Sequence, residues 1–298
     1  MQKDIYKMKT TLVTGATGFL GHHLVQKLLC QGDSVIAVLG RPEDKANSLP
    51  QHENLKIYPC SAMFTTDFGH VDTLIHTAFS RGENLQGLAD SIIFTEKVIE
   101  LVNNQDIDSI INISSQGIYK GLEVGESVSE EGTIGPNTSY GLSKWAVENM
   151  LKIGCKKTHT NIRMASLSAN ARFLDFFVNS VVEHKDITVT APHQYASIMD
   201  VSDAVAGILS VEKLICSQRE QVYNLGPGVQ YSILEYAETA NSIGLSFGYP
   251  AVNVTVEDKG VHFAICMDCT RLIAHTGWKP VIMKDEMITK LFVQKSKQ

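Results

Sequence analysis

The sequence predicts an α/β fold with a doubly wound parallel sheet in its N-terminal part and a smaller, mixed α/β region after it. Short segments rich in β-branched residues alternate with longer segments of helical periodicity. This alternation is typical of parallel strands joined by crossover helices. In addition, a glycine-rich turn joins the first expected strand to the first expected helix. Such a turn is typical of α/β proteins that bind phosphate groups at a helix N-terminus.

The elements of the first part follow one another regularly. The expected strands cover residues 10–14, 34–39, 55–58, 71–76, 109–113 and 161–164. The expected helices cover residues 20–30, 88–102 and 139–152. In the first helix Leu20, Leu24 and Leu28 share one face, because residues four positions apart lie above one another on a helix.

The second part is less regular. We expect helices at residues 173–182 and 201–211, and short helices after Asp268 and Asp285. Ser232 and Glu235 have the spacing of a capping box, which predicts a helix from there to residue 243. Extended segments are expected at residues 187–190, 221–224 and 252–256.

Composition excludes several classes of protein. The 298 residues are 44% hydrophobic and 19% charged, as in an ordinary globular protein, and carry a formal net charge of −6. That charge gives no basic surface for nucleic acid or an anionic membrane. No apolar run has membrane-spanning length and residues 1–9 are polar, so we expect a cytoplasmic protein. Cys266 and Cys269 form a C-x-x-C pair without a second ligand pair, so no metal site is expected.

The first chemical motif is TGATGFLG at residues 14–21, between an apolar strand and a helix. Gly15 allows the tight turn, Gly18 lets a pyrophosphate approach the backbone, and Gly21 permits close packing of the helix on the strand. The helix N-terminus supplies amide donors. An ordinary strand–turn–helix is the alternative, but the context favours a Rossmann-type site for NAD or NADP.

The second strand bears on the choice of dinucleotide. An acidic residue that binds the adenosine ribose is expected at its end, but Leu39 stands there, and Arg41 is close by. An arginine at this place pairs well with a 2′-phosphate, which favours NADP over NAD. The alternative is that Arg41 is simply solvated.

The second and third motifs predict a catalytic group. Tyr140 and Lys144 are four residues apart on an expected helix, so the phenol and the ammonium share one face. A nearby cation lowers the pKa of a tyrosine, so we expect Tyr140 to act as a general acid or base. Ser115 ends an expected strand and can donate a hydrogen bond to a reacting oxygen.

With these motifs in this order, the chain resembles the extended short-chain dehydrogenases/reductases of the NAD-dependent epimerase/dehydratase family. The resemblance extends to residues 74–78, 199–205, 222–226 and 276–280. It implies that Tyr140 exchanges a proton with a substrate hydroxyl or carbonyl, and that Lys144 also binds the nicotinamide ribose. Other cofactor contacts implied by it are Gly15, Thr17, Gly18, Phe19, Leu20, Gly21, Thr77 and Ala78.

The resemblance also implies a domain division and an assembly. Residues 1–165 are expected to form the NAD(P)-binding Rossmann domain. Residues 166–298 are expected to form the substrate-binding region, with some elements returning to the Rossmann core. A homodimer is implied through the helices at 88–102 and 139–152.

Several positions depart from the family pattern. Gln116 and Gly117 stand where the sugar 4,6-dehydratases of this family carry an acidic pair, so that reaction is not expected. The donors that hold a substrate diphosphate are missing at Ser166, at Ala196 and around residues 258–260. Nucleotide sugars are therefore expected to bind weakly, unless a basic residue such as Lys259 or Arg163 reaches the phosphates.

Three functions remain open. The first is an NAD(P)-dependent oxidoreductase or epimerase of a nucleotide sugar or a related polyhydroxy carbonyl compound. The second is an NADPH-dependent reductase of a smaller, non-nucleotide ketone or aldehyde. The third is a dinucleotide-sensing regulator, which would need the glycine loop but not Ser115, Tyr140 and Lys144.

Overall fold

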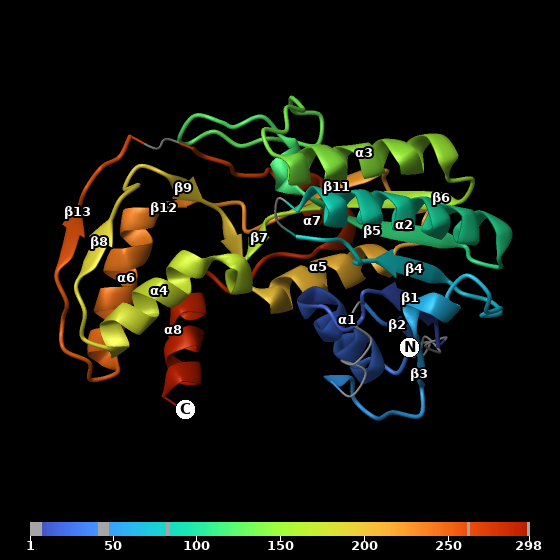
Figure 1. Cartoon of the computed structure of the whole chain (residues 1–298), viewed down its shortest axis with the longest axis horizontal. Coiled ribbons are helices and arrows are strands. Elements are labelled where there is room, and N and C mark those ends of the chain that lie inside the picture. The colour runs from blue at the N-terminus through green and yellow to red at the C-terminus, as the bar shows by residue number, and fades with distance from the viewer. Residues whose placement is uncertain (1–7, 41–47, 82–83, 261–262, 297–298) are drawn as a thin grey trace, which may run out of the picture. The chain divides into compact units, whose positions relative to one another are not determined.

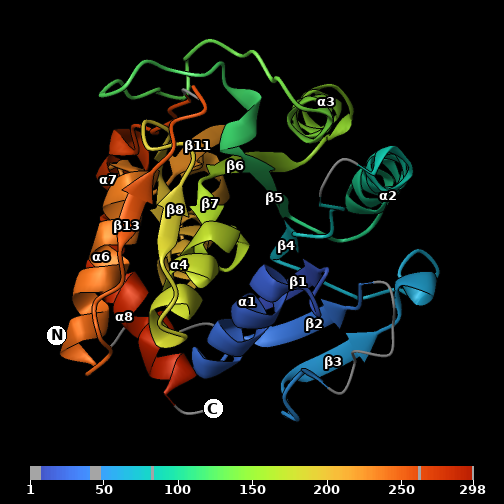
Figure 2. The same ribbon diagram turned by 60° about the vertical axis from the view of Figure 1, so that its left-hand side comes forward.

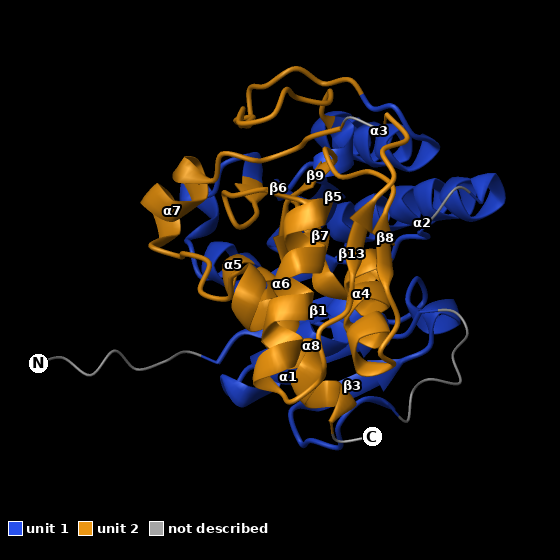
Figure 3. Ribbon diagram, turned by 90° about the vertical axis from the view of Figure 1, so that its left-hand side faces the viewer, with its two compact units in different colours: residues 1–118, 136–163, 208–223 blue, residues 119–135, 164–207, 224–298 orange. Residues whose placement is uncertain are grey.

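The computed structural model describes residues 8–40, 48–81, 84–260 and 263–296 (Figure 1). The chain divides into two compact units, shown in two colours in Figure 3. The first unit comprises Met1–Ile118, Pro136–Arg163 and Ile208–Tyr223. The second comprises Tyr119–Gly135, Met164–Gly207 and Asn224–Gln298. Each unit is therefore assembled from three separate stretches of the chain.

A seven-stranded sheet with the order β11-β6-β5-β4-β1-β2-β3 forms the framework of the first unit. Its strands are β1 (Thr10–Thr14), β2 (Ser34–Val38), β3 (Leu55–Tyr58), β4 (Thr73–His76), β5 (Ser109–Ser115), β6 (Thr158–Met164) and β11 (Val222–Leu225). The pairs β1–β2, β2–β3, β1–β4 and β4–β5 are parallel. The strand order reverses between β1 and β4, and open α/β sheets bind their ligands at the carboxyl ends of the strands at such a point.

Helices cover both faces of this sheet (Figure 2). They are α1 (Phe19–Cys30), α2 (Leu85–Asn104) and α3 (Ser139–Gly154). Helices α2 and α3 bury Val98, Val102, Val147 and Leu151 in one apolar cluster with strand residues such as Leu74. Helix α1 packs against β1 and β2 on the other face. The predicted Rossmann-type doubly wound fold is confirmed.

The second unit has its own apolar core. Helices α4 (Arg172–Val182), α6 (Ile233–Ser246) and α8 (Lys284–Lys295) pack together around Phe177, Tyr236 and Phe292 (Figure 1). Short strand pairs accompany them: β8 (Ile187–Val189) with β13 (Val254–Val256), β7 (Ser166–Leu167) with β10 (Ile198–Met199), and β9 (Tyr195–Ala196) with β12 (Tyr231–Ser232). Helix α7 (Thr270–Thr276) also belongs to this unit, and α5 (Val201–Glu212) begins in it and ends in the first unit.

The expected elements occur near their expected places, with shifted bounds. Helix α2 begins at Leu85 because the Asn84 side chain caps it, and α8 begins at Lys284, one residue before Asp285. The capping box of Ser232 and Glu235 is present as predicted. The sequence did not predict β7, β9, β10 and β12, because two residues are too few to show an alternating pattern. Short 3-10 helices occur at Cys60–Ala62, Gln116–Ile118, Ser168–Asn170 and Cys216–Gln218.

No helix within the described ranges is both long enough and apolar enough to cross a membrane.

Candidate active site

The turn after β1 leaves no room for a side chain at Gly15 or Gly21. Gly15 has a φ of +68°, and a Cβ there would lie 2.9 Å from the backbone nitrogen of Ala78. A Cβ on Gly21 would overlap the Gly15 carbonyl oxygen. Gly18 caps the N-terminus of α1, and its amide donates to the Gly15 carbonyl at 2.9 Å. The turn is therefore shaped as a backbone cradle at a helix N-terminus, which suits a pyrophosphate.

The other predicted contacts of this turn are arranged around it. Thr17 Oγ1 accepts a hydrogen bond from the Gly40 amide at 3.2 Å, and Thr77 Oγ1 donates to the Thr14 carbonyl at 2.6 Å. Phe19 is 40% exposed at the start of α1, whereas Leu20 is buried and holds the helix on the sheet. Thr77 and Ala78 thus contact the glycine turn, and Leu20 acts through packing.

His76 connects the ends of two strands to α2. Its Nδ1 lies 2.8 Å from Thr14 Oγ1 and its Nε2 lies 3.0 Å from Thr95 Oγ1. Thr95 Oγ1 donates its own proton to the Ser91 carbonyl at 2.7 Å. The Thr95 hydroxyl can therefore only accept from His76, which must donate through Nε2. Nδ1 then accepts from Thr14. Burial, with the nearby Lys144 charge, lowers the pKa of His76 to about 3, so the imidazole is neutral.

Ser115 and Tyr140 lie together at the end of β5 and the start of α3. Ser115 is the last residue of β5, and Tyr140 lies in the first turn of α3, which Thr138 caps through a bond from the Gly141 amide. The Ser115 side chain hydrogen-bonds the Tyr140 phenol, and Ser115 Oγ also accepts from the Gly117 amide at 3.0 Å. A reacting oxygen near this pair would meet two hydroxyl groups.

Lys144 lies one turn further along α3 and is 4% exposed. Its Nζ donates to the Ile113 carbonyl at 2.8 Å and lies 5.8 Å from the centre of the Tyr140 ring. Burial and the repulsion of Arg81 lower the pKa of Lys144 to about 7, and Glu148 raises it. The helix therefore presents the phenol and the ammonium together.

The expectation that a cation holds the pKa of Tyr140 low is wrong for this chain. Burial raises the pKa of Tyr140, and the Arg81 charge and the Ser115 hydrogen bond offset only part of that effect. The reason is that the phenol is removed from water, while Lys144 is itself buried and only partly charged. Tyr140 is thus a protonated phenol at neutral pH, which suits it to donate a proton.

A buried ion pair supports the same helix. Glu148 accepts two hydrogen bonds from Arg163 Nε, at 3.1 and 3.3 Å, and one from Arg163 Nη2 at 2.8 Å. Ser114 Oγ donates to Glu148 at 2.5 Å. Both charged side chains are about 95% buried, so Arg163 is committed to this pair. It is therefore not the basic residue that would compensate for missing phosphate donors.

Three contributors near the site were missed from the sequence. Phe79 packs edge-on against Tyr140, with 6.0 Å between ring centres, and Arg81 acts on both Tyr140 and Lys144 through its charge. Both lie in the loop after β4, where no periodicity places a side chain. Glu148 could have been found, because it follows Lys144 by four residues on the same helix face.

Leu39 and Arg41 were proposed to select the dinucleotide, and Lys259 was proposed as a possible contact to the substrate phosphates. Leu39 is 5% exposed and its amide donates to the Tyr58 carbonyl at 3.0 Å, so its side chain packs in the core. Arg41 lies outside the described residues. Lys259 is exposed in the second unit, with its amide bonded to the Thr190 carbonyl at 3.0 Å.

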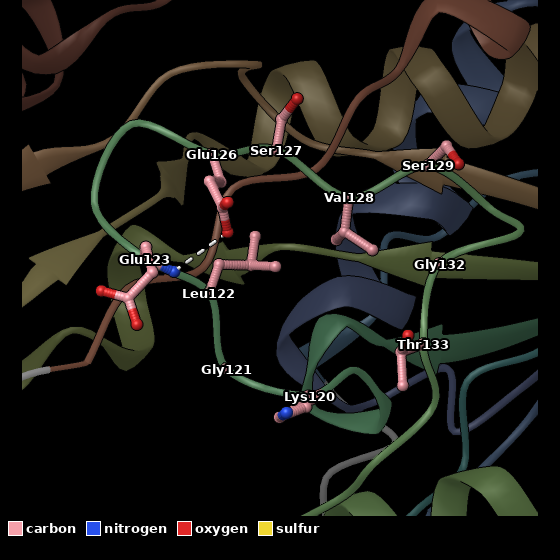
Figure 4. A pocket seen from close by; sticks show the side chains of 10 residues that line it. All are labelled: Lys120, Gly121, Leu122, Glu123, Glu126, Ser127, Val128, Ser129, Gly132 and Thr133. Carbon is pink, nitrogen blue, oxygen red and sulfur yellow. Dashed lines mark hydrogen bonds between the residues drawn. The ribbon is translucent and has the colours of Figure 1, made fainter.

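A pocket of about 440 Å³ lies within the second unit (Figure 4). A single loop between Lys120 and Thr133 lines it, and the Glu123 amide donates to Glu126 across one end at 3.2 Å. Asn224 anchors this loop by accepting from the Tyr119 hydroxyl at 2.7 Å and donating to the Val128 carbonyl at 2.9 Å. The lining includes none of the predicted catalytic residues.

Two groups have metal-ligand chemistry. Cys266 and Cys269 are buried free thiols, and burial raises the pKa of Cys269 to about 12, so neither is a ready thiolate. His70, Asp106 and Asp108 bring ligand atoms within 4.8 Å of one another on the surface. His70 lies 3.2 Å from Asp106 and 3.8 Å from Asp108, and exposed acidic groups of this kind are common without a metal.

Comparisons with known proteins show the family of this chain. A model of the NAD dependent epimerase/dehydratase family matches residues 11–226. The chain is 23% identical over 303 residues to a putative UDP-glucose 4-epimerase of Methanocaldococcus jannaschii, covering 94% of this chain and 96% of that one. It is 24% identical over 299 residues to a dTDP-glucose 4,6-dehydratase of Streptomyces griseus, covering 91% and 89%.

A solved structure is also similar. The UDP-glucuronic acid 4-epimerase of Bacillus cereus, in complex with UDP-glucuronic acid and NAD, has a TM-score of 0.78 at 20% identity. The match covers 97% of this chain and all of that one. The fold is therefore similar to that of this epimerase over 97% of the chain.

Proposed function

Since the chain belongs to the NAD dependent epimerase/dehydratase family, a family of enzymes, we propose that it is an NAD(P)-dependent oxidoreductase or epimerase. Its proposed substrate is a nucleotide sugar or a related polyhydroxy carbonyl compound. The named relatives act on nucleotide sugars, which supports this class.

One observation carries the proposal. The consecutive residues Ala78 and Phe79 connect the glycine turn to the catalytic helix: the backbone of Ala78 would touch a Cβ on Gly15, and Phe79 packs against Tyr140. We infer that a dinucleotide held by this turn would extend toward Ser115, Tyr140 and Lys144, because one short segment contacts both the turn and the helix. The backbone cradle at Gly15, Gly18 and Gly21 fits such a cofactor.

The side chains have separate roles in this reaction. Bound nicotinamide supplies the hydride chemistry. Tyr140 Oη gives its proton to a carbonyl oxygen that is being reduced, and takes it back in the reverse direction. Ser115 Oγ donates a hydrogen bond to the same oxygen. Lys144 brings a positive charge one helical turn away, which stabilises the phenolate left behind.

A tyrosine whose pKa is raised keeps its proton at neutral pH, so Tyr140 starts in the protonated form that the reducing direction needs. We further propose NADP as the preferred dinucleotide, because Leu39 offers no carboxylate to a ribose and Arg41 follows it closely. An enzyme that exchanges NADPH at each turnover is a reductase, whereas an epimerase retains its NAD.

The test is to identify any nucleotide that copurifies with the protein and to titrate NADPH and NADH by calorimetry. We expect tighter binding of NADPH, and we expect Arg41→Ala to weaken NADPH while leaving NADH nearly unchanged. Equal affinities, or stoichiometric NAD in the purified protein, would contradict the NADP proposal and favour the epimerase.

A smaller ketone or aldehyde is the second candidate substrate. The observation that favours it is the commitment of Arg163 to Glu148, which removes a possible phosphate ligand. Ser166 and Ala196 supply no charge either.

A further inference from the structure

The Phe79 ring lies against both groups that would move or stabilise the proton. Lys144 Nζ is 3.8 Å from the centre of that ring, and the Tyr140 ring meets it at an angle of 80°. A cation over the face of an aromatic ring is attracted by the ring's quadrupole, and the attraction grows when the cation is desolvated. Lys144 is 4% exposed, so this contact is of the stronger kind.

The segment that carries Phe79 is held on both sides. Before it, Thr77 Oγ1 donates to the Thr14 carbonyl at 2.6 Å. After it, the Ser80 amide donates to Ser91 Oγ on α2 at 2.9 Å. The backbone on both sides of Phe79 is therefore anchored to the sheet and to α2.

We propose that Phe79 is a positioning residue for the proton-transfer pair, and that its ring face keeps the Lys144 ammonium charged and directed toward Tyr140. The part of this inference that concerns turnover rests on the proposed function. The part that concerns the charge of Lys144 is a property of the folded chain alone.

The charges that face Lys144 explain why the ring matters. Arg81, in the loop after β4, repels the ammonium, and His76 on β4 is neutral. Glu148, on the same helix, attracts it, but this carboxylate is shared with Arg163 and Ser114. Tyr140, also on that helix, is a neutral phenol at neutral pH.

Burial and the Arg81 charge lower the pKa of Lys144 to about 7, and Glu148 raises it. Because this pKa is near neutral pH, a modest attraction to the ammonium changes the fraction of Lys144 that is charged. Besides the ring, the ammonium has the Ile113 carbonyl as a hydrogen-bond acceptor, at 2.8 Å. Removal of the ring's attraction should lower the pKa of Lys144 by roughly one unit. About ten times less of the side chain would then be charged in the alkaline range.

The experiment compares Phe79→Leu, which keeps an apolar group of similar size, with Phe79→Tyr, which keeps the ring face. The Lys144 charge is followed by its side-chain carbon resonances in lysine-labelled protein, with Lys144→Arg used to assign the signal. We expect the Lys144 titration to move by roughly one unit to lower pH in Phe79→Leu and to stay in place in Phe79→Tyr. An unmoved titration in Phe79→Leu, or an equal shift in both variants, would overturn the proposal.

The pH profile of kcat provides the functional measurement. If Lys144 must be charged for turnover, the alkaline limb moves to lower pH in Phe79→Leu and is restored in Phe79→Tyr. A profile that does not move, although the Lys144 resonances do, would overturn the link between this contact and proton transfer. The resonance titration needs neither substrate nor cofactor. It therefore tests the contact between Phe79 and Lys144 even if the proposed reaction is wrong.

Discussion

His76 shows how neighbours determine the state of a single residue. Its two nitrogens lie between Thr14 and Thr95, and the Thr95 hydroxyl is committed to a carbonyl. A second proton on His76 would put a charge in a fully buried site, and Thr14 Oγ1 would have to turn its own proton away from Nδ1. The side chain thus holds the end of β1 beside the loop after β4 only while it is neutral.

This arrangement predicts a pH dependence of stability. The pKa of His76 is about 3 in the folded chain, against an ordinary value of 6.5 when unfolded. Between these values the unfolded state binds the extra proton, so the free energy of unfolding rises with pH. His76→Gln keeps one donor and one acceptor but does not titrate.

We expect urea unfolding to show that wild type loses stability relative to His76→Gln as the pH falls from 6.5 toward 3. The difference between their free energies of unfolding should change by up to about 1.4 kcal/mol per pH unit in this range. Above pH 6.5 the difference should be constant. Parallel stability curves for the two proteins across the acid range would show that His76 does not carry this effect.

At the scale of elements, the turn between β1 and α1 has little tolerance for change. Gly15→Ala adds a Cβ in a left-handed conformation and presses it against the backbone of Ala78. Gly32→Ala is a matched control, because Gly32 also has a positive φ but nothing within 4 Å of the added Cβ.

We expect Gly32→Ala to cost about 1 kcal/mol of stability and to leave dinucleotide binding unchanged. Gly15→Ala should cost more, because a backbone clash adds to the same conformational strain, and it should weaken dinucleotide binding at least tenfold. Thermal unfolding and calorimetric titration measure the two effects. Equal behaviour of the two variants would mean that the close approach at Ala78 is unimportant.

The elements themselves could largely be read from the sequence. Glycine spacing and strand–helix alternation predicted the sheet, and the four-residue spacing of Tyr140 and Lys144 predicted their shared face. The protonation of these groups could not be predicted, because burial arises from segments distant in sequence. Phe79 and Arg81 were missed for the same reason: a loop position acquires its neighbours only when β4 and α3 are folded.

At the scale of the whole molecule, the open question is the size and charge of the substrate. A nucleotide diphosphate needs fixed cationic donors, and a charge-assisted hydrogen bond contributes roughly 1.5–3 kcal/mol. Arg163 is committed elsewhere, which leaves Lys259 among the residues considered for this role. The homodimer also remains a proposal, supported by exposed Ile93 on α2 and Leu142 on α3.

We therefore predict that UDP, dTDP and GDP bind the cofactor-loaded protein weakly, since loss of two arginine contacts lowers affinity by about a hundredfold or more. Calorimetric titration with each nucleotide measures this directly, and Lys259→Ala is the variant to compare. Micromolar binding of any of the three would contradict the prediction and identify a nucleotide-sugar enzyme. Absence of binding to all three would favour the smaller carbonyl substrate.

The central claim is that Tyr140 transfers the proton in a nicotinamide-dependent reaction. The measurement that tests it most directly is turnover by Tyr140→Phe, together with dinucleotide affinity, on the substrate found by screening nucleotide sugars and small ketones. Because only the hydroxyl is lost, we expect unchanged dinucleotide binding and a fall in kcat of roughly 10²-fold or more. Turnover near the wild-type rate by Tyr140→Phe would contradict the account.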